Sequence, residues 1–385
     1  MSRARTDNPF FMNLIVTARD PATAVSFDKL LPVLAKHPQF QLRVLCQHPA
    51  YDILAITQSS ASFDLIEVNN DEFRVTLEDD FIREQFSDFQ PDAVLTGISG
   101  PDTGIDEAVL HYARQRSIQS YALQSFWGDI NQKARAIPDT AFVLDEEAAR
   151  VTEQRYPQIR SVPIGSIKHM DYCHYAPLPE RQQKRPGLVK TEEVLVGFYG
   201  QPIPDIPGYL ETIQGLARQL RHWDRAFKVM VRPHPKESSV LRVQTLAMLR
   251  AELGTERVVT DPFDDIKDSL VVCDLVTSAF STCGFDNLYL NEIAPQAFST
   301  SVYLWFQPEL IQWWRAYSQL ERMPLIEEGL LLAVEKEEQM LKVFEEGLKP
   351  STQAELRRRA TRKLPRPQDA IDCIIDTCLR DYHRT

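Results

Sequence analysis

The feature that most constrains this chain is a repeated alternation of short apolar runs with amphipathic segments. The apolar run 11–18 has the length of a strand, and behind it Phe27, Leu30, Leu31 and Leu34 fall at the spacing of one buried helix face. Further strand-like runs lie at 41–47 and 63–69, a strand followed by a helix lies within 91–118, and the segments 119–129 and 140–156 continue the alternation. Strands that alternate with helices favour parallel pairing, so we predict an α/β fold with doubly wound parallel sheets.

The alternation stops once and then restarts, which indicates two domains. Residues 175–193 are rich in proline and charge, and a new apolar run begins at 194. A chain of 385 residues can bury two separate cores. We predict two Rossmann-like domains that face each other across a cleft, at 1–174 and 194–325, with 175–193 as a linker. Residues 326–385 are expected to form a helical tail whose last helix packs back on the N-terminal domain.

Charge and composition exclude several classes of function. With 54 acidic and 43 basic residues the net charge is -11, so the surface should repel nucleic acid and any anion site must be local. No apolar run reaches the roughly 20 residues of a membrane span, and no signal peptide is evident. The six cysteines form no CxxC pair, which argues against a disulfide framework or a zinc site. We expect a cytoplasmic protein without a bound cofactor.

A cationic loop at a predicted strand end is the first candidate site. The segment "VRPHPKES" (231–238) follows the apolar "AFKVM" and carries Arg232, His234 and Lys236. In open α/β sheets ligands bind beyond the carboxyl ends of the strands, so this loop could meet an anion such as a phosphate. The alternative is a solvated turn.

Two further loops are expected at the same edge. The segment "TSAFSTCG" (277–284) carries Ser278, Ser281 and Thr282 at the head of a predicted helix, where hydroxyls and backbone N–H groups can cradle a phosphate. Gly200 and Gln201 follow the strand that opens the second domain. The alternative for the hydroxyl run is a helix cap with a turn.

These motifs resemble those of the glycosyltransferase-B superfamily. A strand ending in "RPHP", with "VTSAFST" after a short helix, is similar to the branch of bacterial capsule and sialic-acid-type transferases and polyglycerol-phosphate transferases. The resemblance implies that His234 and Pro235, with Ser281 and Thr282, hold the phosphates of a nucleotide-sugar donor. It also implies a donor domain at 194–325 and a domain at 1–174 for a glycan or lipid-linked acceptor.

The catalytic base is less well defined by the resemblance. The paired acids followed by glycine are absent, and the nearest match is "GPDTGIDE" (100–107), where Asp102 could deprotonate an acceptor hydroxyl. Asp102 could instead cap the next helix, and Asp106, Glu107 and Asp129 are substitutes for the base. Arg19 could bind an anion or form a surface ion pair.

The leading hypothesis is a glycosyltransferase for polysaccharide biosynthesis. No Asp-x-Asp motif is evident, so we expect transfer without a metal. The alternatives are a non-hydrolysing nucleotide-sugar 2-epimerase, whose "DSGG" signature is replaced here by "TSAFSTCG", a polyol-phosphate transferase, and a non-catalytic scaffold. No G-x-G-x-x-G follows the first strand, which argues against a dehydrogenase.

For several other features the sequence allows two interpretations. Trp127 could stack on a sugar or lie in the core, and Trp305, Trp313 and Trp314 could line the cleft or attach the tail. The basic stretch 357–366 could be a solvated helix face or a contact with anionic lipid.

Overall fold

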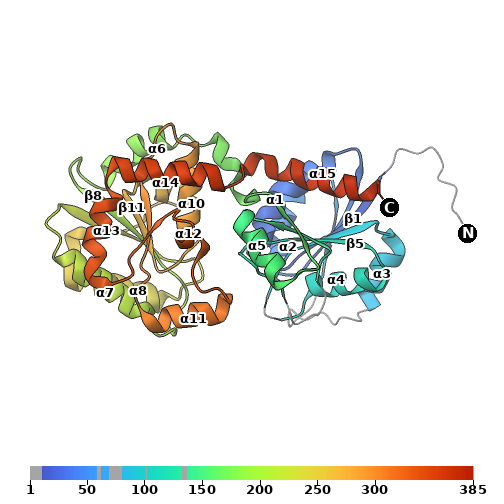
Figure 1. Ribbon diagram of the computed structural model, residues 1–385, viewed down its shortest axis with the longest axis horizontal. Coiled ribbons are helices and arrows are strands. Elements are labelled where there is room, and N and C mark those ends of the chain that lie inside the picture. The colour runs from blue at the N-terminus through green and yellow to red at the C-terminus, as the bar shows by residue number, and fades with distance from the viewer. Residues whose placement is uncertain (1–10, 59–61, 69–79, 101, 132–136, 385) are drawn as a thin grey trace, which may run out of the picture. The chain divides into compact units, whose positions relative to one another are not determined.

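The computed structural model describes residues 11–58, 62–68, 80–100, 102–131 and 137–384 (Figure 1). The chain forms two compact units. The first unit comprises residues 1–170 and 363–385, and the second comprises residues 171–362. No helix in the described ranges is long and apolar enough to cross a membrane.

The first unit is built on a seven-stranded sheet in the order β3-β2-β1-β4-β5-β6-β7. Every pair of neighbouring strands in it is parallel, and Leu14 of β1 lies between Leu42 of β2 and Ala93 of β4. The strands are β1 (Met12–Ala18), β2 (Phe40–Cys46), β3 (Asp64–Glu67), β4 (Ala93–Thr96), β5 (Gln119–Leu123), β6 (Thr140–Val143) and β7 (Arg160–Pro163).

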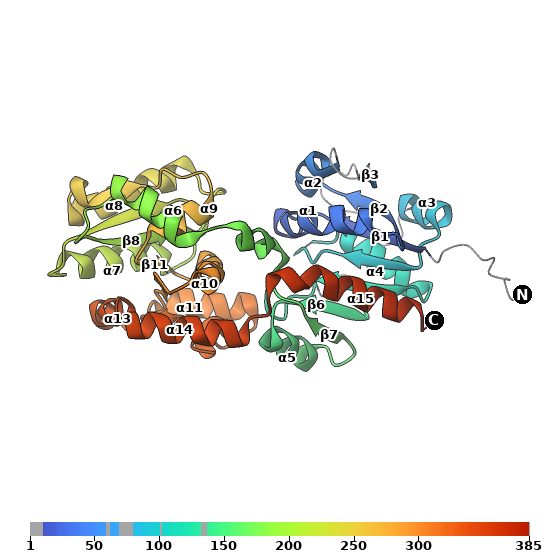
Figure 2. The same ribbon diagram turned by 90° about the horizontal axis from the view of Figure 1, so that it is seen from above.

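Helices cover both faces of this sheet because the strands are apolar on both sides (Figure 1). Leu14 and Val16 of β1 belong to a core cluster with residues of α1, α2 and α15, whereas Ile15 belongs to a cluster with residues of α3 and α4. Helix α15 also lies beside α1 (Figure 2). The helices are α1 (Pro21–Lys36), α2 (Ala50–Gln58), α3 (Asp80–Phe89), α4 (Ile105–Gln115), α5 (Glu146–Arg155) and α15 (Ala370–Tyr382).

The second unit repeats this plan with a six-stranded sheet in the order β10-β9-β8-β11-β12-β13. All of its ladders are parallel, as the alternating pattern predicts. The strands are β8 (Val194–Tyr199), β9 (Phe227–Arg232), β10 (Val258–Thr260), β11 (Leu275–Ser278), β12 (Thr300–Tyr303) and β13 (Leu332–Ala333). The prediction of two Rossmann-like α/β domains is therefore confirmed.

Helices again pack on this sheet, and α7, α8 and α13 share one apolar core with it. The α-helices are α6 (Pro177–Lys184), α7 (Tyr209–Arg221), α8 (Ser239–Leu253), α9 (Ile266–Val272), α10 (Cys283–Ile293), α11 (Pro308–Ser318), α12 (Pro324–Glu327), α13 (Met340–Gly347) and α14 (Pro350–Lys363). Short 3-10 helices complete the chain: η2 (Ile167–His174), η3 (Arg185–Gly187), η4 (Thr255–Arg257), η5 (Glu337–Gln339) and η6 (Pro367–Asp369).

The boundaries differ from those expected from the sequence. The expected linker 175–193 contains helix α6, which packs on α9 and belongs to the second unit. Arg181 of α6 donates hydrogen bonds to the carbonyl oxygens of Val271 and Cys273, both at 2.7 Å, and also pairs with Asp274. The expected tail 326–385 is divided between the units at residues 362 and 363, and it is not wholly helical, since β13 adds a strand to the second sheet.

Candidate functional site

The second unit has a point at which the strand order reverses, between β8 and β11. Loops that leave strands in opposite directions open a crevice there, and this is the usual ligand site of such sheets. Two hydrogen bonds connect the loops that follow β8, β9 and β11. The Gly200 amide donates to the Arg232 carbonyl at 2.9 Å, and the Phe280 amide donates to Gln201 Oε1 at 3.1 Å. Three loops expected from the sequence thus lie at one edge of the sheet.

His234 is held in a defined orientation by its own loop. Its backbone amide donates to Glu237 Oε1 at 2.9 Å, and its Nδ1 accepts from the Lys236 amide at 3.1 Å. Burial and the charge of Lys236 lower the pKa of the imidazole from its ordinary value of 6.5. A neutral ring whose Nδ1 is an acceptor carries its proton on Nε2, so His234 presents a hydrogen-bond donor at Nε2.

Gly200 lies against this loop. A Cβ built on Gly200 would lie 2.1 Å from Glu237 Oε1, far inside ordinary contact. Glu237 is only 7% exposed, and burial raises the pKa of its carboxyl group. A side chain at this position would therefore displace the carboxyl group that shapes the His234 loop.

The two cations of the loop have different surroundings. The Arg232 guanidinium donates to Asp261 Oδ2 at 2.6 Å and to the carbonyl oxygens of Phe263 and Asp264 at 2.7 and 2.8 Å. These contacts hold the loops after β9 and β10 together, so the Arg232 side chain is engaged within the protein. Lys236, in contrast, is exposed.

The hydroxyl loop after β11 is folded by its own serines. Ser278 Oγ accepts from the Ser281 amide at 3.0 Å, and Ser281 Oγ accepts from the Cys283 amide at 3.3 Å. Thr282 is the exposed N-cap residue of α10 and makes no side-chain capping bond. The loop is therefore a turn held by its own serines in front of a helix N-terminus, which favours an anion.

The first unit has the corresponding reversal between β1 and β4, where a buried polar cluster lies. Asp106, at the start of α4, is 1% exposed and accepts from Thr17 Oγ1 at 2.6 Å and Ser99 Oγ at 2.8 Å. Burial raises the pKa of Asp106 above its ordinary value. Gln47 Oε1 accepts from the amide of Ile105 at 2.8 Å, while its buried Nε2 has no hydrogen-bond partner among the described residues.

Glu107 organises the loop that carries Asp102. Its carboxylate accepts from the Gly104 amide and from Asn131 Nδ2, both at 2.8 Å, and lies 3.7 Å from Arg19 Nη2. Burial, followed by the nearby charge of Asp106, raises the pKa of Glu107 to about 7. Of the two buried neighbours Asp106 and Glu107, Glu107 therefore has a carboxyl group that can change protonation near neutral pH.

Asp102 lies at the tip of this loop. Its side chain is exposed, and its carbonyl oxygen accepts from Arg19 Nη2 at 2.8 Å and from Asn131 Nδ2 at 3.0 Å. The N-cap position of α4 is Gly104, so the capping alternative for Asp102 is wrong. Arg19 is 5% exposed, so it is a buried cation of this loop rather than part of a surface pair. Burial raises the pKa of Asp129, a substitute for the base, to about 6.

The structure places the four tryptophans for which the sequence allowed two interpretations. Trp127 is 1% exposed, and its Nε1 donates to both carboxylate oxygens of Asp145 at 3.0 Å, which makes it a core residue of the first unit. Trp305, Trp313 and Trp314 form an aromatic cluster with Phe280 within the second unit.

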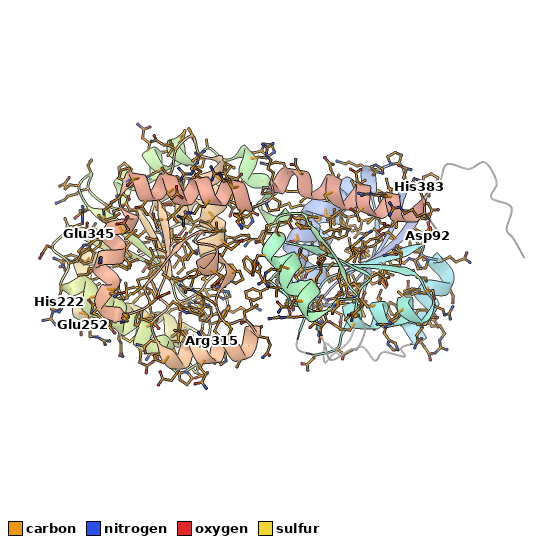
Figure 3. All side chains as sticks on the ribbon, in the orientation of Figure 1. Asp92, His222, Glu252, Arg315, Glu345 and His383 are labelled. Atoms are coloured by element: carbon orange, nitrogen blue, oxygen red, sulfur yellow. The ribbon has the colours of Figure 1, made fainter. Side chains whose placement is uncertain are left out.

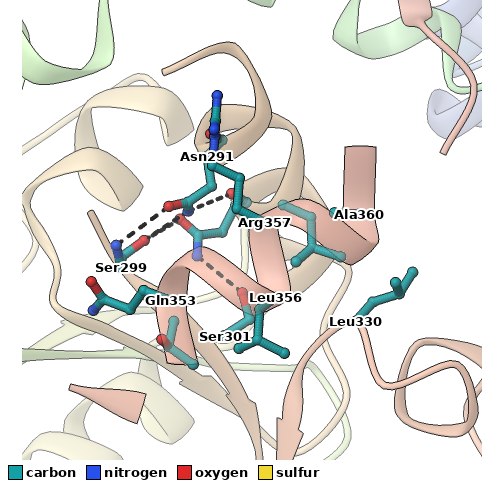
Figure 4. A pocket seen from close by; sticks show the side chains of 11 residues that line it. Asn291, Ser299, Ser301, Leu330, Gln353, Leu356, Arg357 and Ala360 are labelled. Atoms are coloured by element: carbon teal, nitrogen blue, oxygen red, sulfur yellow. Dashed lines mark hydrogen bonds between the residues drawn. The ribbon is translucent and has the colours of Figure 1, made fainter. Parts of the chain in front are cut away.

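A hollow beside α14 is lined by residues of α10, β12 and α14 (Figure 4). Asn291 donates to Ser299 Oγ at 3.0 Å and accepts from the Phe298 amide at 3.0 Å. Arg357 donates to the carbonyl oxygens of Asn291, Glu292 and Ala294 at the end of α10. This arginine of the basic stretch 357–366 is therefore turned inward.

Some residues of these sites were not expected from the sequence. Glu237 and Asp261 shape the loops of the second unit, and Gln47 and Asn131 those of the first. Glu237 acts on His234 within its own loop, whereas Asp261, Gln47 and Asn131 act on partners that are distant in the sequence. Among the described residues, no cluster of three or more histidines, cysteines or carboxylates is suited to a metal ion.

No known protein family matches the sequence, and no curated protein matches it. Solved structures do match the fold. One is the UDP-GlcNAc 2-epimerase of Neisseria meningitidis bound to UDP-GlcNAc, at 14% identity over 96% of this chain and 100% of that chain, with a TM-score of 0.63. A glycosyltransferase of Rickettsia africae matches at 10% identity over 97% and 98%, with a TM-score of 0.64. MurG of Acinetobacter baumannii matches at 11% over 96% and 99%, with a TM-score of 0.60.

These matches define the class of fold. The chain has the two Rossmann-like domains of the glycosyltransferase-B fold, as its motifs predict. At this level of identity the likeness is one of fold alone, and the same fold serves epimerases and transferases.

Proposed function

We propose that this protein is a glycosyltransferase that uses a nucleotide-activated sugar, with the donor bound by the second unit. The observation that carries the proposal is the convergence of three loops at the strand reversal of that unit, where His234 after β9 presents Nε2–H and α10 begins after β11. A helix N-terminus and a preoriented donor suit a phosphate group. The fold is shared with an epimerase bound to UDP-GlcNAc and with an enzyme named as a glycosyltransferase, which supports the same assignment.

In the proposed reaction, the phosphate-binding groups act on the leaving nucleotide. As the bond between the sugar and the phosphate breaks, negative charge grows on the phosphate oxygen. His234 Nε2–H, Lys236 and the amides of the Thr282 loop stabilise this charge. Arg232 supports the site through Asp261 rather than by binding the donor itself.

The first unit would bind the acceptor, a glycan or lipid-linked sugar. The acceptor hydroxyl forms the new bond to the sugar carbon and loses its proton to a carboxylate. We assign this role to Asp102, because its side chain is exposed while Arg19 and Asn131 fix its backbone. No step of this scheme requires a metal.

A nucleotide-sugar 2-epimerase is the second candidate. Several of the structures with this fold are UDP-N-acetylglucosamine 2-epimerases. Glu107, with its pKa raised to about 7, has the acidity expected of a group that exchanges protons near neutral pH. Its burial and its three fixed partners favour a positioning role, so we rank this activity second.

The test is a thermal-shift panel of CMP, CDP, UDP, GDP, ADP and their sugar conjugates. We expect at least one nucleotide to stabilise the wild type and His222→Ala, which removes an exposed histidine after α7, but not His234→Ala. Products formed from the sugar conjugate, followed by NMR with and without glycan acceptors, then separate transfer from epimerisation. If no nucleotide stabilises the wild type, the proposal fails and the scaffold alternative replaces it.

A further inference from the structure

The buried side chain of Glu107 makes more contacts than a helix cap requires. As the third residue of α4 it accepts through Oε2 from the amide of the N-cap residue Gly104 at 2.8 Å, which is the usual role of a glutamate at this position. Its other oxygen, Oε1, accepts from Asn131 Nδ2 at 2.8 Å, and Arg19 Nη2 lies 3.7 Å from Oε2. Neither of these two contacts belongs to the cap, so they require a separate explanation.

Asn131 and Arg19 also donate to the carbonyl oxygen of Asp102. The distances are 3.0 Å from Asn131 Nδ2 and 2.8 Å from Arg19 Nη2. These are the same two nitrogen atoms that face the Glu107 carboxylate. Each of the two donors is therefore shared between Glu107 and Asp102, so the carboxylate of Glu107 orients the groups that fix the Asp102 backbone.

This arrangement needs an ionised carboxylate. Both oxygens of Glu107 face N–H groups, and a carboxylate accepts at both, whereas a protonated carboxyl group presents a hydrogen atom at one of them. When Glu107 is neutral, either the Gly104 amide or Asn131 Nδ2 therefore loses its acceptor. Two charged groups act on Glu107, namely Asp106 beside it on α4 and Arg19 after β1. Burial, followed by the charge of Asp106, raises the pKa of Glu107 to about 7 although Arg19 lowers it, so the ionised form is lost as the pH falls below neutrality.

We propose that Glu107 is the positioning residue of the Asp102 loop, and that this loop is held for proton transfer only while Glu107 is ionised. Glu107 itself exchanges no proton with the acceptor, and it acts through Asn131 and Arg19. The role of Asp102 as base rests on the proposed function, whereas the link between Glu107 and the Asp102 backbone does not. For that function the consequence is that transfer weakens as the pH falls below about 7.

The test observes the Asp102 carbonyl group by NMR, in the full chain and without any ligand. Labelling aspartate with ¹³C at the carbonyl carbon and threonine with ¹⁵N selects the peptide bonds between aspartate and a following threonine, which occur in this sequence after Asp102, Asp139 and Asp376. The ¹³C shift of the Asp102 carbonyl should follow the ionisation of Glu107, with a midpoint at about pH 7. The Asp139 carbonyl is the reference in the same spectrum, because it accepts from the Arg160 amide at 3.0 Å.

Glu107→Gln should abolish this titration, because the amide group accepts at one end only and so mimics the protonated form. The Asp102 carbonyl should then keep its low-pH shift at every pH. Gln47→Leu is the control for the cap alone, since Gln47 accepts from an amide of the same first turn at 2.8 Å, and its midpoint should not change. Asp92→Asn is the control for charge, because the exposed carboxylate of Asp92 accepts from the Asn13 amide at 2.9 Å, and it should also leave the midpoint unchanged (Figure 3).

The proposal is overturned if the Asp102 carbonyl does not titrate near pH 7, or if the titration persists in Glu107→Gln, which would assign it to another group. Loss of the titration in Gln47→Leu would show that the cap alone positions the loop, and it would also overturn the proposal. Thermal denaturation checks that each variant is folded. If Glu107→Gln does not fold, Asn131→Ala takes its place, and removal of this shared donor should reduce the amplitude of the titration, whereas an unchanged amplitude would refute the link.

These measurements use neither a nucleotide nor an acceptor. Failure of the nucleotide panel therefore leaves the titration of the Asp102 carbonyl unchanged. Conversely, a working transferase whose Asp102 carbonyl does not respond to Glu107 would refute this proposal alone.

Discussion

Substituting Gly200 by alanine should damage the donor site more than the fold. The new Cβ would lie 2.1 Å from Glu237 Oε1, where ordinary contact begins at 3.4 Å, so the carboxyl group must move by about 1.3 Å. That movement breaks the 2.9 Å hydrogen bond from the His234 amide, which costs about 0.5–1.5 kcal/mol. Overpacking destabilises the folded protein by about 1–3 kcal/mol more. Alanine also reduces the conformational entropy of the unfolded chain, which offsets about 0.4–1 kcal/mol of this loss.

We therefore expect Gly200→Ala to lower the free energy of unfolding by about 0.5–4 kcal/mol, which in a unit of this size lowers Tm by about 2–4 °C per kcal/mol. Nucleotide affinity should fall by more than tenfold, because the His234 loop loses its anchor. Thermal denaturation and calorimetric titration measure the two effects. Gly187→Ala is the matched control, since a Cβ there meets nothing within 4 Å.

A double-mutant cycle tests whether the clash with Glu237 causes the loss of stability in Gly200→Ala. If the clash with Glu237 is responsible, Gly200→Ala combined with Glu237→Ala should be less unstable than the sum of the single changes. Additive effects, or a Gly200→Ala protein with wild-type nucleotide affinity, would refute the reasoning.

Three further outcomes are expected. The pKa of Glu107 is raised in the folded state, so the folded protein binds more protons than the unfolded chain between the ordinary pKa of 4.5 and about 7. Stability should thus rise as the pH falls from 8 to 5, by at most about 3 kcal/mol, and Glu107→Gln should flatten this dependence in denaturation curves. Asp102→Asn should reduce transfer by about 10²–10⁴-fold while nucleotide affinity stays within about twofold; equal loss of both would contradict its role as base. Trp127→Phe leaves the buried Asp145 without the indole N–H, so urea denaturation should show a loss of about 1–3 kcal/mol in the first unit, and an unchanged midpoint would argue against that bond.

The sheets could be predicted from the sequence because each strand is a local pattern. The apolar run 11–18 and the helix face of Phe27, Leu30, Leu31 and Leu34 recur in the structure as β1 and α1. Helix α6 within residues 175–193 was not expected, because the prolines Pro177 and Pro179 are typical of loops. Both lie in the first turn of α6, where proline costs no hydrogen bond. Strand β13 has only two residues and is too short for any periodicity to reveal it.

The candidate site was predictable in position but not in detail. The rule that ligands bind at strand ends placed the loops of Gly200, His234 and Ser281 at one edge. The engagement of Arg232 could not be seen, because its partner Asp261 lies 29 residues away and no pattern connects them. Burial is equally invisible in a sequence, which is why Glu107 was expected only as a substitute for Asp102.

Hydrogen–deuterium exchange with the nucleotide that gives the largest thermal shift tests the central claim most directly. Nucleotide bound at the strand reversal of the second unit should slow amide exchange in residues 199–203, 232–238 and 278–284, and His234→Ala should abolish this protection. Protection confined to other parts of the chain, or unchanged by His234→Ala, would contradict the assignment of the donor site.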